Sequence, residues 1–428
     1  MAGLTLMMQA TSSGIALLQT WPVLLTIALS GGCYAVWYLR VIATRARTVG
    51  SDRMQAFLLR HVPVLEQRQW PTWWAWHAMI STLARVILQK EKRVFFRREI
   101  LVLRDGGQVA LDWNEPPGQE KNSRTPIVLL LPGIAGSSKE GYVSNGAAIC
   151  SDLGYQSVIF SNRGQGGVSI TSARGYNAAC CEDLCEVLIY VQSTSPQSPM
   201  VVCGYSMGGM ISSHFFGKYS REKQLAPSAR ADPSSPPTCI AECNVVGGIG
   251  MSMPWDPIKS RKSLESTALN RSLNRRITSD LHKFVHRCSV DNMEYKNVIE
   301  SVPGGYSHVM QASTISEFDQ RCVVPTFGFS SLDDYYQRAS PERHIADVTI
   351  PVLYLHAADD MFILGDDLPT EKIRASQYCA MVITKWGGHL GFLEGTIPTG
   401  DTFGDKLLAQ YVKAVMDHGG EFQPPTPS

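Results

Sequence analysis

An excess of charge is absent from this chain of 428 residues. Lys and Arg together number 39 and Asp and Glu 38, so the formal net charge is +1. A nucleic-acid-binding protein needs a concentrated basic face, so the composition gives no reason to expect a nucleic-acid partner. Charged residues make up only 18% of the chain and hydrophobic residues 44%, which allows a sizeable buried core.

Cys-x-x-Cys pairs are also absent, although the chain has 11 cysteines. Cys181 and Cys185 stand four positions apart, as do Cys239 and Cys243, but no matching pair of histidines completes a zinc site. An odd number of cysteines without this pattern indicates free, mostly buried thiols in a reducing compartment. We therefore expect no metal.

The first 39 residues contain no Asp, Glu, Lys, Arg or His. Within them, residues 22–39 are almost wholly apolar, and a membrane-spanning helix needs about 20 such residues. Aromatic residues stand towards the ends of this run, as they do at membrane interfaces: Trp21, Tyr34, Trp37 and Tyr38. A cleaved signal peptide would need a basic segment before the apolar run, and none precedes it. Residues 1–47 are therefore predicted to be an uncleaved, single-pass membrane anchor.

Arg40, Arg45 and Arg47 follow the apolar run directly. The positive-inside rule then places the large C-terminal part in the cytosol. The endoplasmic reticulum is one membrane compatible with this topology.

Residues 48–97 form a bridging segment that contains Trp70, Trp73, Trp74 and Trp76. Two interpretations stay open: the segment lies along the membrane surface, or it packs on the main domain. Aromatic stripes belong more often to a core than to a lipid-binding surface.

An alternation of strands and helices begins at Arg98. The runs Glu99–Leu103 and Gln108–Trp113 flank Asp105-Gly106-Gly107, a hairpin signal. Short apolar runs typical of strands buried on both faces follow: 127–131, 157–160, 200–203, 245–249, 352–355 and 381–384. Helical patterns such as 182–191 and 405–416 separate several of them. We therefore predict an α/β fold in residues 98–420, with a mostly parallel sheet flanked by helices.

Three segments depart from the alternation. Residues 225–238 are rich in Pro, Ser and Ala and are predicted to be a surface loop or disordered insertion. Residues 254–341 are long and polar and stand between two strands, so we expect a cap over the sheet. The tail 421–428 is expected to be disordered.

The strand at 200–203 leads into Gly204-Tyr205-Ser206-Met207-Gly208, which has the G-x-S-x-G pattern of a nucleophile elbow. Gly204 and Gly208 are needed because larger side chains would clash in so tight a turn. Ser206 stands at the start of a helix, where free N–H groups favour developing negative charge. Ser206 is therefore the candidate nucleophile.

A serine hydroxyl needs a base, and the base needs an orienting acid. In this fold the chain order is Ser, acid, His. His389, between glycines after the strand 381–384, is the candidate base. The acid should follow the strand 352–355, where Asp359 and Asp360 compete; counting three positions from His356 favours Asp359.

Two backbone N–H groups should bind the oxyanion. One belongs to Met207, directly after the nucleophile. The other is expected in the loop that follows the strand 127–131, and Ile134 is the candidate.

Two further patterns do not predict a separate site. Asn162-Arg163-Gly164-Gln165-Gly166-Gly167 lacks the Lys-Ser/Thr ending of a P-loop, so a structural turn is favoured. His286 and Asp291 match an H-x-x-x-x-D pattern that some acyltransferases use, but they fall within the expected cap.

Several short segments between about residues 70 and 415 carry a family resemblance: Pro71-Thr72-Trp73, Arg98-Glu99, Asp105-Gly106-Gly107-Gln108, Leu111-Asp112-Trp113, Leu131-Pro132-Gly133, Ser138-Lys139-Glu140, Asn162-Arg163-Gly164, Glu317-Phe318-Asp319, Asp333-Asp334-Tyr335-Tyr336 and Gly388-His389-Leu390-Gly391-Phe392. The chain resembles the α/β-hydrolase-domain (ABHD) lipases of AB-hydrolase family 4, close to the members that act on phospholipids and acylglycerols. The resemblance implies the α/β-hydrolase fold and the triad Ser206, Asp359 and His389. Met361 departs from the family, which often has proline there.

These observations predict a membrane-anchored serine hydrolase that cleaves lipid esters without a metal or an organic cofactor. Acyl transfer and thioester hydrolysis use the same triad and stay open as alternatives. A non-catalytic scaffold with the hydrolase fold is a third interpretation, which the intact triad disfavours.

Overall fold

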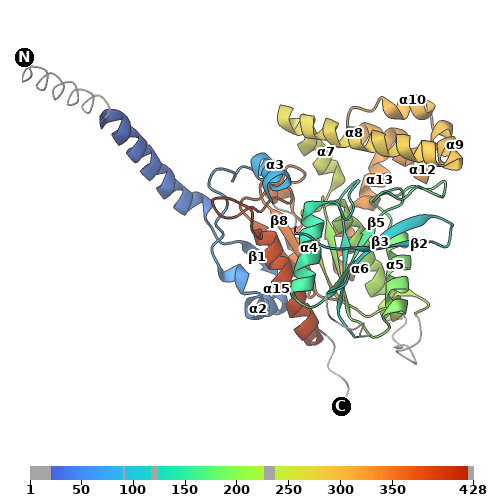
Figure 1. Cartoon of the computed structure of the whole chain (residues 1–428), viewed down its shortest axis with the longest axis horizontal. Helices are drawn as coiled ribbons and strands as arrows, with labels where there is room; N and C mark the ends of the chain where they lie inside the picture. The colour runs from blue at the N-terminus through green and yellow to red at the C-terminus, as the bar shows by residue number, and fades with distance from the viewer. Residues whose placement is uncertain (1–20, 90–91, 117–123, 226–236, 423–428) are drawn as a thin grey trace, which may run out of the picture.

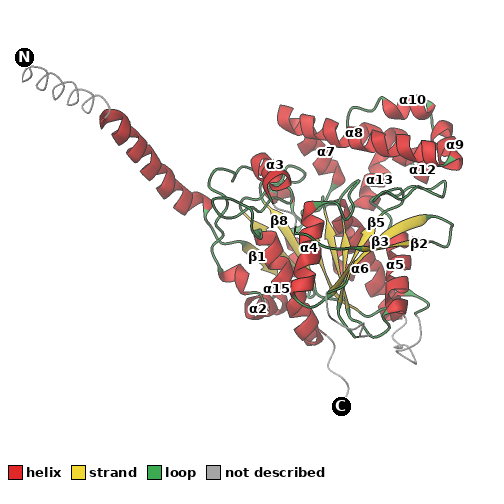
Figure 2. Ribbon diagram, in the orientation of Figure 1, coloured by secondary structure: helices red, strands yellow, loops and turns green. Residues whose placement is uncertain are grey.

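The computed structural model describes residues 21–89, 92–116, 124–225 and 237–422. A nine-stranded sheet forms the centre of the molecule, with helices on both of its faces (Figures 1 and 2). The strands follow the order β1-β9-β8-β7-β6-β4-β5-β3-β2. Their bounds are β1 Arg47–Gly50, β2 Arg97–Val102, β3 Gln108–Asn114, β4 Ile127–Leu131, β5 Gln156–Ser161, β6 Met200–Tyr205, β7 Val245–Met251, β8 Val352–Ala357 and β9 Cys379–Thr384.

The six strands from β4 to β9 are parallel to one another, whereas β1, β2 and β3 pair antiparallel at the two edges. All six apolar runs of the sequence form these parallel strands. The predicted hairpin joins β2 to β3, and Gly106 adopts a φ of 80° in its turn. The α/β-hydrolase fold predicted from the sequence is therefore confirmed.

The strands at the centre of the sheet are mostly apolar and are buried because both faces are covered. In β4, Ile127, Leu129 and Leu131 belong to one hydrophobic core, while Val128 and Leu130 belong to the other. This division follows from the two-residue period of a strand. The continuous apolar run therefore supplies two cores at once.

Two groups of helices cover the sheet. On one face lie α5 (Glu182–Thr194) and α6 (Met207–Leu225), whose apolar residues enter the first core. On the other lie α2 (Asp52–His61), α4 (Gly141–Asp152) and α15 (Phe403–His418). Two further α-helices lie outside the helical insertion: α3 (Ala78–Leu88) and α14 (Thr370–Ala375).

A group of helices stands between β7 and β8 and occupies much of residues 254–341. It lies over one end of the sheet, where α8, α9 and α10 are prominent (Figure 1). Its helices are α7 Pro257–Ser266, α8 Ala268–Asp291, α9 Met293–Ser301, α10 Gly305–Met310, α11 Ile315–Phe318, α12 Val324–Phe327 and α13 Leu332–Ala339. We call this segment the helical insertion.

The N-terminal part of the chain contributes more to the fold than the sequence indicated. β1 pairs with β9 as an edge strand, and α2 places Met54, Phe57 and Leu58 in the second core. Residues 48–97 are therefore part of the hydrolase fold as well as a connection to the expected anchor. β1 is only four residues long, so its pattern is too short to be recognised as a strand.

One helix in the described part of the chain is long and apolar enough to cross a membrane. It spans Trp21–Ile42, has 22 residues, and none of its most apolar stretch is buried (Figure 1). The eleven cysteines are all free and most are buried, as expected. Residues 1–20 of the expected anchor, 226–236 of the expected insertion and 423–428 of the tail lie outside the described residues.

Candidate active site

The elbow places Ser206 between the end of β6 and the start of α6. Its φ is 52°, in the left-handed region that residues other than glycine rarely adopt. Its N–H donates to the carbonyl of Met251 at 2.8 Å, which ties the turn to the neighbouring strand. Such local strain persists where the surrounding structure enforces it, and it is common at active sites.

The two glycines of the elbow are required by close approaches of the backbone. A Cβ atom at Gly204 would lie 2.4 Å from the carbonyl oxygen of Gly208. A Cβ at Gly208 would lie 2.4 Å from the carbonyl oxygens of both Leu131 and Pro132. Because the obstacles are backbone atoms, neither position has room for a side chain.

The structure brings Ser206 and His389 together. His389 Nε2 lies 2.9 Å from Ser206 Oγ, and the two residues are 183 positions apart in the chain. On the other side of the ring, His389 Nδ1 lies 3.0 Å from Asp360 Oδ2 and 3.2 Å from Asp360 Oδ1. The arrangement therefore joins a hydroxyl, an imidazole and a carboxylate in a continuous hydrogen-bonded line.

The carboxylate on His389 is that of Asp360, so the assignment of Asp359 as the orienting acid was wrong. β8 continues to Ala357, and His356 lies within the strand rather than in the turn. The turn begins at Ala357, whose carbonyl accepts from the Asp360 N–H at 3.1 Å. Counting three positions from the true strand end gives Asp360.

Asp359 instead holds the backbone of the histidine loop. Its Oδ1 accepts from the Gly388 N–H at 2.9 Å. Its Oδ2 is buried and has no hydrogen-bond partner among the described residues. Burial, with the neighbouring Asp360 charge in addition, raises the pKa of Asp359 to about 7 despite the Gly388 hydrogen bond.

In Asp360 the opposing influences on the pKa have the opposite result. It is fully buried, and burial alone would raise its pKa. The charge of His389 and its hydrogen bond, together with the influence of His356 and the Phe362 N–H, outweigh burial and lower the pKa of Asp360. The carboxylate is therefore held ionised beside the ring.

Helix α3 supports the histidine loop, which the sequence gave no reason to expect. Thr82 Oγ1 accepts from the backbone N–H of His389 at 3.0 Å. Arg85 donates to the Leu390 carbonyl and forms a buried ion pair with Asp405 at 3.2 Å. The ring of Phe362 packs on His389 with centroids 4.1 Å apart. No local pattern could reveal these contacts, because Thr82 and His389 are 307 residues apart.

The two expected oxyanion donors lie at the serine. Gly133, next to Ile134, is close enough that a Cβ there would lie 3.2 Å from Ser206 Cβ. Ile134 and Met207 both line the cavity that Ser206 lines. Neither backbone N–H has an acceptor among the residues that the structure describes. By contrast, the neighbouring N–H groups of Gly133 and Ala135 donate to Tyr142 and Tyr176.

Two cavities meet at Ser206. The first has an empty volume of about 750 Å³, and its lining combines the elbow with the helical insertion. Its apolar lining includes Ile134, Met207, Met210, Leu264, Ile277, Ile315 and Phe362. The second is wider, about 1360 Å³, and has a more polar lining that includes Arg85, Lys139, Tyr142 and His389.

The other two patterns noted in the sequence have structural contacts. Arg163, in the glycine-rich turn, is buried and pairs with Asp183 and Asp105, both at 2.7 Å. His286 bonds to Tyr306 on the exposed side of the helical insertion. Neither Arg163 nor His286 lines a cavity that Ser206 lines.

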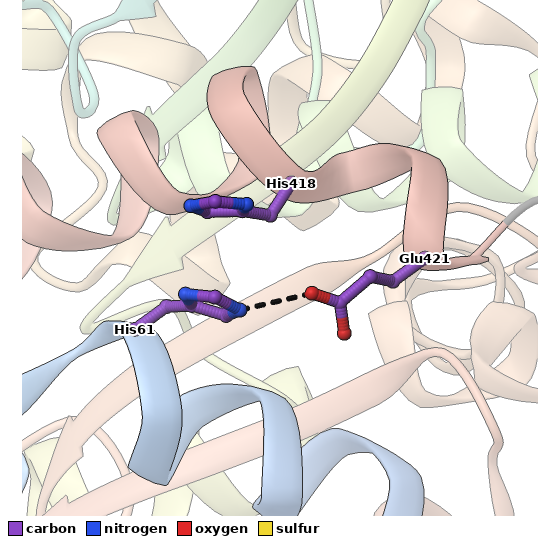
Figure 3. Close-up of side chains that lie close together, drawn as sticks. All are labelled: His61, His418 and Glu421. Carbon is purple, nitrogen blue, oxygen red and sulfur yellow. Dashed lines mark hydrogen bonds and ion pairs between the residues drawn. The ribbon is translucent and has the colours of Figure 1, made fainter.

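One cluster has the side chains of a metal site but not its geometry. His61, His418 and Glu421 lie close together where α2 meets the end of α15 (Figure 3). The two imidazole rings are stacked, with centroids 4.0 Å apart and planes inclined by 16°. A metal lies in the plane of each imidazole that binds it, so two nearly parallel rings cannot share one ion without rotating. Glu421 also pairs with Arg60 at 3.2 Å, which leaves a surface ion-pair cluster.

Comparison with known proteins agrees with the fold. The model of the alpha/beta hydrolase fold family matches residues 126–396. Phospholipase ABHD3 of Bos taurus is 34% identical over 91% of this chain and 89% of its own length. Protein abhd-3.2 of Caenorhabditis elegans is 29% identical over 91% of this chain and 97% of its own length.

A more distant relative is the monoacylglycerol lipase ABHD2 of Mus musculus. It is 22% identical over 85% of this chain and 83% of its own length. The residues matched by the family model, 126–396, include the elbow, the helical insertion and the histidine loop together. The chain therefore belongs to the α/β-hydrolase fold family and, within it, to the ABHD lipases.

Proposed function

We propose that this protein is a serine hydrolase that cleaves carboxylic esters of lipids, with Ser206, His389 and Asp360 as its catalytic residues. The relatives named phospholipase ABHD3 and monoacylglycerol lipase ABHD2 support ester hydrolysis as the activity. The observation that carries the catalytic assignment is the line of hydrogen bonds from Ser206 Oγ through His389 to Asp360.

The first step is attack of Ser206 Oγ on the ester carbonyl. His389 Nε2, 2.9 Å from Oγ, accepts the hydroxyl proton as the new C–O bond forms. Asp360 keeps Nδ1 protonated and stabilises the imidazolium that results. The carbonyl oxygen becomes an oxyanion, for which the unpaired N–H groups of Ile134 and Met207 are the proposed donors.

The second step releases the alcohol and then the acid. His389 returns its proton to the leaving alkoxide as the ester C–O bond breaks, leaving an acyl group on Ser206. A water molecule then attacks the acyl carbonyl while His389 accepts its proton. The acid leaves, and the proton returns to Ser206 Oγ.

The cavities at Ser206 support a lipid as the substrate. The apolar cavity suits an acyl chain, because each buried CH₂ contributes about 0.8 kcal/mol to binding. The wider cavity suits the rest of the molecule, since its lining includes charged and hydroxyl groups. Relatives named phospholipase and monoacylglycerol lipase support glycerolipids as the class.

We also propose that the helix Trp21–Ile42 anchors the enzyme in a membrane. At 1.5 Å per residue, its 22 residues extend about 33 Å, which matches a hydrocarbon core of about 30 Å. The arginines at positions 40, 45 and 47 favour a cytosolic site for the hydrolase part.

The test is a hydrolysis screen over phospholipids and acylglycerols that compares the wild type with Ser206→Ala. We expect the wild type to release fatty acid and to react with a fluorophosphonate. Ser206→Ala should lose labelling, and its turnover should fall by about a thousandfold or more. Near-normal turnover of the variant would assign the nucleophile to another residue, and an inert wild type would refute the proposed activity.

A further inference from the structure

The end of the N-terminal helix is fastened to the tryptophan-rich segment. The ring of Tyr34 packs edge to face against Trp73, with ring centroids 6.3 Å apart. Trp37 and Trp76 have the same arrangement, with ring centroids 5.2 Å apart. Tyr38 donates to the Pro71 carbonyl at 2.5 Å. Wherever this helix enters a membrane, the segment 70–76 is therefore held beside its C-terminal part, at that side of the membrane.

Helix α3 follows this segment directly and exposes an apolar stripe. Ile80, Leu83 and Ile87 stand at positions i, i+3 and i+7, which lie on one side of a helix. Their side chains are 45%, 50% and 76% exposed, whereas Met79 and Ala84 are buried against the body. The helix therefore presents apolar residues both inwards and outwards.

No charge interrupts the outer face of α3. Its only charged residue is Arg85, which is buried and directed towards Asp405 and the Leu390 carbonyl. A surface helix in water normally carries polar residues on its outer face. The exposed tryptophans Trp70, Trp73 and Trp74 extend the apolar surface towards the N-terminal helix. An apolar patch of this kind marks an interaction site.

The same apolar surface reaches the mouth of the wider cavity at Ser206. Val86 of α3 is 81% exposed and also lines this cavity. Leu273 and Ile277 of α8 line it as well, together with His389. Apolar side chains of α3 and α8 therefore line part of the way from the surface of α3 to the serine, beside the charged and hydroxyl groups of the same cavity.

These features lie on one side of the molecule. In Figure 1, α3 and the N-terminal end of α8 lie on the side from which the N-terminal helix projects. The far end of α8, which carries the exposed Val290, points away from that helix. A bilayer that contains the N-terminal helix would thus meet α3 and not the far end of α8.

We infer that α3, with Trp70, Trp73 and Trp74, is a docking surface for a lipid bilayer. In the docked enzyme the wider cavity opens onto the bilayer between α3 and α8, so that a lipid ester passes from the membrane to Ser206 without crossing water. The inference rests on the proposed lipid hydrolase function for the nature of the molecule that enters. The docking itself follows from the packing of residues 71–76, which directly precede α3, on the N-terminal helix.

Photocrosslinking tests the docking independently of catalysis. The full-length protein is reconstituted into phosphatidylcholine vesicles that contain a radiolabelled lipid, with p-benzoylphenylalanine at position 83, 87 or 290. We expect lipid adducts at positions 83 and 87 and none at 290. Absence of adducts at 83 and 87, or crosslinks there to a second copy of the chain, would overturn the inference.

An activity comparison tests the path to the serine. The double variant Leu83→Gln with Ile87→Gln and the control Val290→Gln are assayed on a lipid ester in vesicles and on the soluble ester p-nitrophenyl butyrate. Weakened burial of two apolar side chains should lower vesicle hydrolysis at least about tenfold, with soluble-ester hydrolysis unchanged. An equal loss on both substrates, or no loss on vesicles, would overturn it. If no variant or wild-type protein cleaves either ester, the proposed function fails, while the crosslinking result still decides the docking.

Discussion

Two neighbouring carboxylates near His389 have different contacts, and these give them different tasks. Asp360 lies 3.0 Å from the imidazole, is fully buried and has a lowered pKa. Asp359 accepts a hydrogen bond from the Gly388 N–H of the loop, and burial raises its pKa to about 7. A carboxylate that stays ionised can stabilise an imidazolium, whereas one that titrates near neutrality is poorly suited to that role.

We therefore expect Asp360→Asn to lose most activity and Asp359→Asn to retain much of it. The loss of the acid in a triad costs about ten-thousandfold in turnover, because the imidazole adopts the wrong tautomer. In Asp359→Asn the amide oxygen can still accept from Gly388, so we expect a loss of about tenfold or less, or roughly 1.4 kcal/mol in the barrier. The turnover of both purified variants on one soluble ester checks this. A severe loss in Asp359→Asn with an active Asp360→Asn would contradict the geometry.

Asp319 makes stability depend on pH. It is buried in the wall of the apolar cavity, and burial raises its pKa to about 7 although the Tyr336 hydroxyl donates to it. The unfolded chain therefore releases this proton near pH 4, whereas the folded protein keeps it until near pH 7. The contribution of Asp319 to the free energy of unfolding is thus highest below pH 4. It falls as the pH rises towards 7 and then stays low.

Asp319→Asn should remove this dependence. Between pH 5 and pH 8 the free energy of unfolding of the wild type should fall more than that of the variant, by up to roughly 3 kcal/mol. The free energy of unfolding is measured by denaturant titration at pH 5 and at pH 8. The two proteins compared are Ser206→Ala and the double variant Ser206→Ala with Asp319→Asn, both of which lack the proposed nucleophile. Parallel pH profiles for the two proteins would show that Asp319 does not titrate in this range.

At the scale of elements, α3 acts as a support for the histidine loop. The Thr82 hydroxyl accepts from the His389 N–H, and without it that part-buried N–H loses its partner. An unsatisfied buried donor costs about 1–3 kcal/mol. Thr82→Val should therefore lower the free energy of unfolding by this amount and reduce kcat while KM changes little.

The matched control is Thr82→Ser, which keeps the hydroxyl and should restore both stability and kcat. Thermal unfolding and steady-state kinetics on a soluble ester are the measurements. If Thr82→Ser is as impaired as Thr82→Val, the methyl group and not the hydrogen bond supports the loop.

Sequence patterns predict those features that depend on residues close together in the chain. The six parallel strands appear as apolar runs because both faces of each are covered, and the elbow appears because a tight turn requires its glycines. The choice between Asp359 and Asp360 depends on where β8 ends, and this end is set by pairing with β9, which places Ala357 opposite Thr384. A shift of one residue in the strand end moves the assignment from one carboxylate to the other.

Contacts between distant segments could not be predicted in this way. β1 has only four residues, and its place in the sheet comes from pairing with β9 rather than from its own pattern. The sequence allows two interpretations of the tryptophan-rich segment, and the structure shows packing on the main domain for one of its tryptophans. Trp76 packs on Trp386 with centroids 4.8 Å apart, while Trp73 and Trp74 are exposed.

At the scale of the whole molecule, the N-terminal helix and the active-site cavity are placed so that one membrane could serve both. The helix leaves the body on the side of α3, and the wider cavity has α3 in its wall (Figure 1). An anchored enzyme meets its substrate by diffusion in two dimensions. The N-terminal helix then does more than attach the enzyme, because it also sets the direction in which the wider cavity faces the membrane.

The last prediction concerns the N-terminal helix. It distinguishes attachment of the protein by this helix from docking of α3 on the membrane surface. An embedded helix is not held by charge, so the full-length protein should stay with vesicles in high salt and in alkaline carbonate. Placing arginines in the middle of the span, as in Leu25→Arg with Leu29→Arg, costs about 2.5–3.5 kcal/mol for each residue and should disfavour insertion. This variant should still bind vesicles at neutral pH through α3 but should be released by carbonate, because a surface-bound helix is held more weakly than a spanning one. Sedimentation of both proteins with vesicles checks the prediction, and release of the wild type by carbonate would show that Trp21–Ile42 does not span the bilayer.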